Sequence, residues 1–188
     1  MVQVLLSARG ITNTCRNSFG QNVVHIATQR GSTQIVKLLL KNGLYCNSDL
    51  RGLHPLHFAA LNNDMAMMEV LVDVIGDKIN DSEDKKANEE EKKRLIAETI
   101  NKSQQDGFTP VHYCCHKGSL KLLKYLISVG GDLKLASKKG VTCLHLASAS
   151  GKTAIVEFLL KEKSLGFFVK LRTMASKSLP VHVAAKGG

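Results

Sequence analysis

The sequence predicts an all-α fold, a solenoid of stacked helix–turn–helix units with one charged insertion. Two observations carry this prediction. After each of the first four copies of a recurring histidine, apolar residues follow at helical spacing, ten, thirteen, fourteen and fifteen positions on. Neighbouring histidines stand 32, 55, 33 and 37 residues apart, and a period near 33 is typical of stacked repeats. The recurring histidines are His25, His57, His112, His145 and His182.

The third copy shows how one unit is built. Thr109 can cap a helix, because its hydroxyl accepts an otherwise unpaired backbone N–H. Pro110 suits the first helical position, where a missing N–H costs nothing. Gly118 predicts the end of this short helix. The apolar run 122–127 then predicts a longer second helix, which ends at Gly130.

The segment at each histidine resembles the ankyrin repeat, whose motif reads Thr-Pro-Leu-His-x-Ala. The third copy, residues 109–112, is nearly complete, whereas the first and last copies are degenerate. The resemblance covers most of the chain outside residues 77–104 and implies stacked helix pairs joined by β-turn fingers. We expect the repeated imidazole to join the helix start to a neighbouring turn. The expected structural residues are His25, His57, Thr109, Pro110, His112, Thr142, His145 and His182.

The repeats predict a single domain over residues 1–188. Its full repeats are expected at 17–48, 49–76, 105–137 and 138–172. Residues 1–16 match the second half of a repeat, and residues 173–188 match the beginning of one. A repeat solenoid normally ends in polar capping units, and neither end of this sequence resembles one. We therefore expect a monomeric fragment of a longer chain.

A charged insertion at residues 77–104 interrupts the period. It holds eight acidic and seven basic residues, and its acid-then-base spacing suits a solvated helix. In that helix Leu95, Ile96 and Ile100 would dock against the repeats. A charged loop is the alternative, and a partner-binding or regulatory role is compatible with either.

The net charge of +10 belongs to the repeats, which carry 19 Lys and Arg residues against 8 Asp and Glu residues outside the insertion. In the family that the sequence resembles, the fingers and the exposed side of each first helix form a concave binding face. Basic residues predominate at those positions, which favours an acidic or phosphorylated protein partner. The expected partner-binding residues are Arg30, Arg51, Leu53, Asn62, Phe108, His116, Lys117, Lys138, Lys139 and Val141.

The sequence offers no pattern for catalysis or metal binding. The five cysteines lack metal-ligand spacing, and the repeated histidines stand in different units, too far apart to share an ion. Catalytic motifs and paired carboxylates in a plausible cleft are also missing. We therefore expect no catalytic residue, no metal and no cofactor.

These observations predict a non-enzymatic protein–protein interaction scaffold or adaptor in signalling. The odd number of cysteines and the missing secretory segment favour a reducing, cytoplasmic location. No run is long and apolar enough for a transmembrane segment, and no nucleic-acid-binding module is recognisable, so nucleic acid is not the expected partner. The alternative is the cytosolic ankyrin array of a larger membrane channel or multidomain signalling enzyme.

Overall fold

We describe residues 15–45, 47–77 and 89–187 of a computed structural model of the chain. The second-helix match expected at residues 1–6 lies outside these residues. So do Cys46 and residues 78–88 of the insertion.

Helices form all the regular secondary structure in the described residues, apart from an isolated bridge between Ala136 and Thr142. The all-α class is therefore confirmed. In chain order the helices are α2 (Val23–Gln29), α3 (Thr33–Lys41), α4 (Pro55–Asn62), α5 (Met65–Asp77), α6 (Glu89–Ile100), α7 (Pro110–Lys117), α8 (Leu120–Ser128), α9 (Cys143–Ala149), α10 (Thr153–Lys161), the 3₁₀ helix η1 (Lys163–Lys170) and α11 (Pro180–Gly187).

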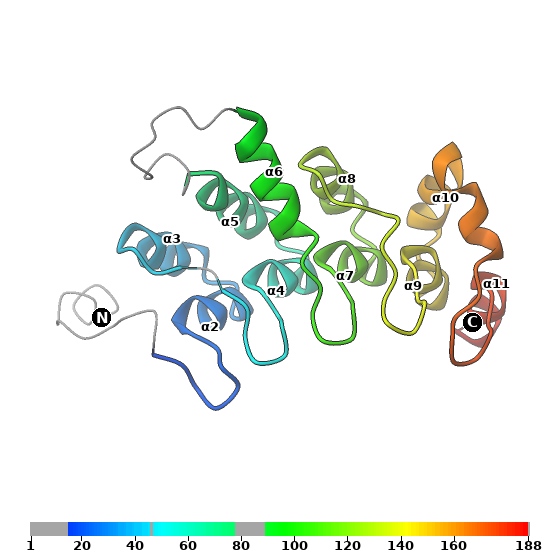
Figure 1. Cartoon of the computed structure of the whole chain (residues 1–188), viewed down its shortest axis with the longest axis horizontal. Helices are drawn as coiled ribbons and strands as arrows, with labels where there is room; N and C mark the ends of the chain where they lie inside the picture. The colour runs from blue at the N-terminus through cyan, green and yellow to red at the C-terminus, as the bar shows by residue number, and fades with distance from the viewer. Residues whose placement is uncertain (1–14, 46, 78–88, 188) are drawn as a thin grey trace. The chain divides into compact units, whose positions relative to one another are not determined.

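The chain forms two compact units, residues 1–99 and residues 100–188. In unit 1, the helix pairs α2–α3 and α4–α5 each fold as a helix–turn–helix (Figure 1). Unit 2 contains the pairs α7–α8 and α9–α10, followed by η1 and α11. The expectation that both units form one domain stays a prediction.

The short first helices begin and end at residues suited to those positions. Pro55 and Pro110 occupy the first turns of α4 and α7, where no intrahelical N–H bond is lost. Asn63 and Gly118 end the same helices in the left-handed conformation, with φ of 55° and 91°. Both residue types tolerate this conformation better than others do, so each copy turns into its second helix at this point.

The core of each unit is aliphatic and lies between successive helix pairs. In unit 1, Leu39 of α3 and Leu71 of α5 are fully buried. Leu126 of α8 and Ile155 of α10 are the corresponding fully buried residues of unit 2. Burial of such a side chain contributes about 1.5–3 kcal/mol, so the second helices contribute strongly to the stability of the repeats.

A β-turn finger precedes each first helix, and successive fingers hydrogen-bond to each other. In unit 2, the N–H of Lys138 donates to the carbonyl of Asp106 at 2.8 Å, and the N–H of Met174 donates to the carbonyl of Lys139 at 2.8 Å. Gly107 makes this approach possible, because an added Cβ would lie 2.7 Å from the Lys138 nitrogen. Its φ of 89° also favours glycine.

Within the insertion, residues 89–100 form the helix α6, the helical alternative of the sequence analysis. It lies against the end of α5, where a Cβ on Gly76 would meet Lys92 Cε at 2.5 Å and Ile96 Cδ1 at 3.3 Å. Ile100 is fully buried, whereas Leu95 and Ile96 are half-buried. Gly76 therefore lies at the contact between α5 and α6, where it faces Lys92 and Ile96.

Candidate functional site

In two copies, the repeated histidine connects the start of its first helix to the next finger. In α9, His145 Nδ1 accepts the backbone N–H of Thr142 at 3.3 Å, which places the ring proton on Nε2. That Nε2–H donates to the carbonyl of Ser178, 3.2 Å away in the next finger. His25 makes the same connection to the Leu53 carbonyl in unit 1, also at 3.2 Å.

Burial keeps two of these imidazoles neutral. His25 and His145 are almost fully buried, and desolvation lowers the pKa of each below its ordinary value of about 6.5. A neutral imidazole can accept at one nitrogen and donate at the other, as these contacts require. His57 and His112 use Nδ1 in the same way, accepting the N–H of the N-cap residue at 3.0 and 3.2 Å.

His182 differs from the other four histidines because its side chain is exposed. Its Nδ1 still accepts the N–H of Leu179, at 3.2 Å, at the start of α11. The helix-start contact therefore occurs in all five copies.

A finger and two first helices of unit 2 surround a hollow of about 290 Å³. The finger contributes Phe108, α7 contributes Tyr113 and His116, and α9 contributes Leu146. The described residues that line it are Gln104, Asp106, Phe108, His112, Tyr113, His116 and Leu146. Aromatic and aliphatic side chains beside a few polar groups form a surface suited to a protein side chain.

The aromatic rings of this hollow support one another edge-on. The ring of Phe108 lies 5.6 Å from that of His112 and 6.5 Å from that of Tyr113, in T-shaped arrangements. His116 Nδ1 and Ser150 Oγ are 2.7 Å apart, which connects α7 to the end of α9. Ring contacts and one side-chain hydrogen bond of a lining residue therefore support the hollow.

Three exposed lysines lie close to the hollow in the chain, at the end of α7 and in the next finger. Lys117 ends α7, and Lys138 and Lys139 lie in the next finger. None of these three lysines forms an ion pair with a described residue. Because the Lys138 backbone pairs with Asp106, which lines the hollow, the basic finger adjoins the aromatic surface.

Two of the predicted binding residues of unit 1, Arg51 and Asn62, make contacts with neighbouring side chains or backbone. Arg51 lies 3.6 Å from buried Asp49 and 6.0 Å from the ring centroid of Phe19, so its charge is partly compensated. Asn62 donates to the carbonyls of Thr28 and Gln29 at 3.2 and 3.1 Å, across to the end of α2. This amide therefore connects two helices.

The other three predicted residues occupy finger or helix-end positions. Arg30 is an exposed residue at the end of α2. Leu53 and Val141 are half-buried in fingers, and their carbonyls accept hydrogen bonds from Asp49 at 2.9 Å and Ser137 at 2.9 Å. Their backbones therefore shape the fingers.

The sequence analysis missed Tyr113, Leu146 and Gln104 as lining residues. A pattern for the first two exists, because each directly follows a repeated histidine. That position holds a large apolar residue in all five copies: Ile26, Phe58, Tyr113, Leu146 and Val183. Ile26 is 40% exposed in unit 1, whereas Phe58 is buried, so only the structure shows which copies present this side chain.

Cysteines form a buried cluster where the first helices of unit 2 meet. Cys114, Cys115 and Cys143 are all buried, whereas Cys15 is exposed. A hydrogen bond to Cys143, and then burial, raise the pKa of Cys115 well above its ordinary value, and burial raises the pKa of Cys114. Protonated thiols of this kind pack as small apolar side chains and are poor nucleophiles.

No group of three or more His, Cys, Asp or Glu side chains in the described part of the chain could hold a metal ion. No helix in that part is long and apolar enough to cross a membrane.

Comparisons with known proteins agree with this geometry. The family model described as ankyrin repeats matches in three copies, over residues 1–83 and 85–173. The poly(ADP-ribose) polymerase tankyrase of Caenorhabditis elegans is 26% identical over 144 residues, which are 75% of this chain and 5% of that protein. The nuclear factor NF-kappa-B p105 subunit of Gallus gallus is 27% identical over 175 residues, 92% of this chain and 16% of that protein.

A shorter relative shows the same repeat on a smaller scale. The Notch-regulated ankyrin repeat-containing protein A of Danio rerio is 34% identical over 61 residues, 32% of this chain and 54% of that protein. The chain thus spans 5% and 16% of the tankyrase and the p105 subunit, and about half of this shorter protein. With its histidine-centred helix pairs, its paired fingers and the match of the family model to most of its length, the chain belongs to the ankyrin-repeat family.

Proposed function

We propose that this chain is a non-enzymatic scaffold or adaptor that binds an acidic protein segment on its fingers and first helices. Ankyrin repeats are a general protein–protein interaction module and are typically non-catalytic. The observation that carries the proposal is the aromatic hollow of unit 2, lined by Phe108, Tyr113 and Leu146, beside a basic finger.

The acidic character of the partner is inferred from charge. Lys117, Lys138 and Lys139 are exposed and make no ion pair with a described residue, so a carboxylate or phosphate of a partner can approach them without displacing an existing partner. An apolar side chain of the same partner would enter the hollow. A signalling role and a cytoplasmic location, where cysteines stay reduced, accompany this proposal.

The test is charge reversal in the basic finger. Binding proteins are captured from a lysate with the wild-type chain, identified by mass spectrometry, and measured against the Lys138→Glu/Lys139→Glu variant. We expect at least a tenfold weaker affinity, about the effect of reversing two exposed charges, mostly as slower association. The difference should shrink as salt rises, because screening acts over about 8–10 Å at physiological ionic strength.

A matched control is available on the second helices of unit 2. Lys121 of α8 and Lys161 of α10 are exposed and outside the fingers, so Lys121→Glu/Lys161→Glu changes the net charge equally. An equal loss of affinity in both variants would indicate non-specific attraction and would refute the finger assignment. Tyr113→Ala should weaken the same partner without any dependence on salt.

A second candidate is that the repeats serve a longer protein. This chain is similar to 5% of a protein named as a polymerase and to 14% of one named as a tyrosine-protein kinase. A multidomain enzyme or a channel that uses these repeats for recognition is compatible with both similarities. An antibody against this chain would then detect a natural product well above 20.5 kDa.

A further inference from the structure

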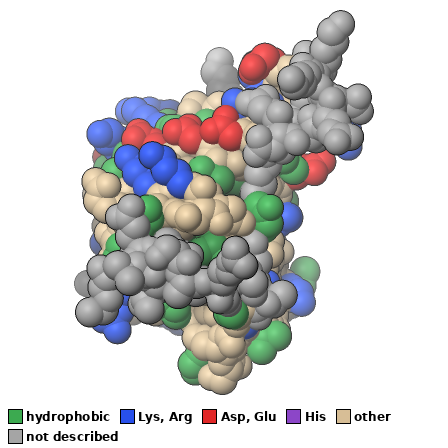
Figure 2. Space-filling model, turned by 90° about the vertical axis from the view of Figure 1, so that its left-hand side faces the viewer, with side chains coloured by type: hydrophobic (Ala, Val, Ile, Leu, Met, Phe, Trp, Pro, Cys, Tyr) green, Lys and Arg blue, Asp and Glu red, His purple; other side chains and the backbone are tan. Residues whose placement is uncertain are grey.

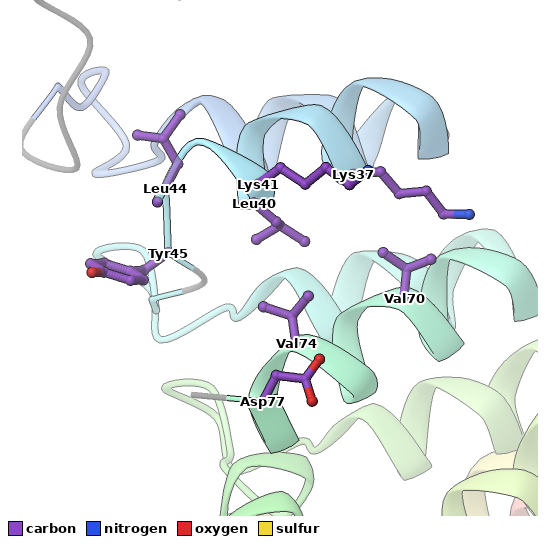
Figure 3. A pocket seen from close by; sticks show the side chains of 9 residues that line it. Lys37, Leu40, Lys41, Leu44, Tyr45, Val70, Val74 and Asp77 are labelled. Atoms are coloured by element: carbon purple, nitrogen blue, oxygen red, sulfur yellow. The ribbon is translucent and has the colours of Figure 1, made fainter. Parts of the chain in front are cut away.

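A groove separates the second helices α3 and α5 of unit 1, on the side away from the fingers. Its volume is about 400 Å³. In Figure 3, Leu40 of α3 and Val70 and Val74 of α5 point toward one another across it. All three side chains are half-buried, so the groove has an apolar floor that is open to solvent.

The corresponding helix pair of unit 2 shows why this groove is open. There, the ammonium of Lys124 lies 5.6 Å from the ring centroid of Phe158 and bridges α8 and α10. The same two repeat positions, twelve and thirteen residues after the histidine, hold Lys37 and Val70 in unit 1. Because valine has no ring to receive the lysine, the space between α3 and α5 is left unfilled.

The length of α5 extends the groove. This helix has 13 residues and α3 has 9, so the last turn of α5 continues beside the loop after α3. Leu44 and Tyr45 of that loop line the groove, as does Asp77 at the end of α5. The groove is therefore long enough to hold more than a single side chain.

The charges along the groove are unequal. Lys37 and Lys41 both line it from α3, one helical turn apart, and neither pairs with a described residue. Among the described lining residues, the one carboxylate is that of Asp77, which lies 3.8 Å from the ammonium of Lys92. The α3 side therefore presents two uncompensated positive charges above an apolar floor.

We propose that this groove binds an acidic amphipathic helix of a partner protein. The apolar seam of that helix would cover Leu40, Val70 and Val74, and carboxylates one turn apart would face Lys37 and Lys41. Helices commonly bind in this way, with an apolar face in a groove between two helices. This second interaction surface is separate from the fingers and does not depend on the function proposed above.

The charges of α5 favour a helix over an anionic membrane. Glu69, Asp73 and Asp77 lie one turn apart on α5 and are exposed. On the face shown in Figure 2, acidic side chains lie directly beside basic ones on the upper part. A flat anionic surface would meet the carboxylates of α5 together with the lysines of α3, whereas a helix can place its acidic edge toward α3 alone.

The test uses the full chain and a synthetic probe. The probe is a fluorescein-labelled helical peptide of about 14 residues, roughly four turns, with leucines along one seam and glutamates along one edge. Fluorescence anisotropy gives its affinity, and a peptide with glutamine at each glutamate is the control probe. We expect the acidic peptide to bind at least about tenfold more tightly than the control peptide.

Three variants test the basic side and the apolar floor of the groove. Lys37→Glu/Lys41→Glu should weaken the acidic peptide about tenfold, whereas Lys37→Arg/Lys41→Arg should retain it. Val70→Phe should fill the groove as Phe158 does in unit 2 and should abolish binding of both peptides. Circular dichroism checks that each variant is folded. Lys37 and Lys41 are exposed, so their substitution should leave the core intact.

Matched charge reversals elsewhere separate this proposal from the finger surface. Lys121→Glu/Lys161→Glu and Lys138→Glu/Lys139→Glu should each leave the peptide affinity within about twofold of wild type. Failure of the wild-type chain to bind, or unchanged binding by folded Val70→Phe, would overturn the proposal.

Three other occupants would also overturn it. Phosphatidylserine vesicles that compete with the peptide would assign the groove to membrane binding, and self-association lost in Val70→Phe would assign it to a second copy. If the acidic peptide bound only to a variant with Asp81→Asn, Glu83→Gln and Asp84→Asn, the groove would be assigned to the chain's own acidic stretch.

Discussion

At the scale of residues, the repeated histidine performs two tasks with one neutral ring. Its Nδ1 caps the start of its own helix, and in His25 and His145 the Nε2–H reaches the next finger. The sequence analysis expected such a connection from the resemblance, and the hydrogen bonds show its geometry. A protonated ring could not accept the cap N–H, so this contact depends on the neutral form.

The first prediction at this scale concerns His145. His145→Ala removes the acceptor for Thr142 and the donor to Ser178, and we expect the free energy of unfolding to fall by about 1–3 kcal/mol at pH 7.5. Chemical denaturation measures this change. Lys121→Ala, at an exposed position of α8, is the control and should stay within about 0.5 kcal/mol of wild type.

The His145→Ala variant also tests how the stability of the chain depends on pH. Burial lowers the pKa of His145, so below about pH 6.5 the unfolded chain takes up a proton that the folded chain resists. The contribution of His145 to the free energy of unfolding is therefore fully present above about pH 6.5. It is lost as the pH falls toward the lower pKa that His145 has in the folded chain. The midpoint of unfolding should therefore drop less steeply from pH 7 to pH 5 in His145→Ala than in wild type. Parallel curves would contradict this assignment.

At the scale of elements, α5 and α6 are the pair that departs from the regular repeat. The sequence analysis left a helix and a loop open for the insertion, and residues 89–100 are helical. The charges from Glu89 to Arg94 allow a solvated helix, but the sequence does not show that this helix packs at Gly76 of α5. Contact between α5 and a helix inside the insertion is a tertiary feature, so no local pattern could reveal it.

The second prediction concerns this attachment. Gly76→Ala places a methyl group against the flexible end of Lys92 and should be neutral or stabilising by up to about 1 kcal/mol, because alanine favours the helix. Gly76→Phe cannot be accommodated against Ile96 and should separate α6 from α5, lowering the melting temperature by several degrees. Equal stability of the two variants would show that α6 contributes no packing there.

At the scale of the whole molecule, stability is distributed over two compact units, 1–99 and 100–188. Stacked repeats contact mainly their neighbours, so a local defect is felt mostly by adjacent units. The sequence analysis treated residues 1–188 as one domain, and that prediction requires a test of cooperativity.

The third prediction supplies that test. Leu71 is fully buried in unit 1, and Leu71→Ala should cost about 2–5 kcal/mol. We expect hydrogen exchange, measured by mass spectrometry, to accelerate in α2–α5 and to stay unchanged in α9 and α10. Equal acceleration in all of these helices would show that the two units unfold as one domain.

The sequence by itself determined the repeat, the family and the all-α class, because these follow from local spacing. Helix caps, glycine stops and apolar periodicity act within a few residues of one another, and five copies reinforce the pattern. The sequence also predicts Phe108 and His116 as partner-binding residues from their position relative to the histidine, and both line the hollow of unit 2.

Only the tertiary structure decided which of these positions form surfaces. Tyr113 and Phe58 occupy the same repeat position, yet one lines the hollow and the other is buried. The open groove between α3 and α5 likewise depends on the side chain at Val70 and on the length of α5. The physical reason is that exposure and cavities depend on how side chains of neighbouring units fill the space between them, and this is not a property of the repeat spacing.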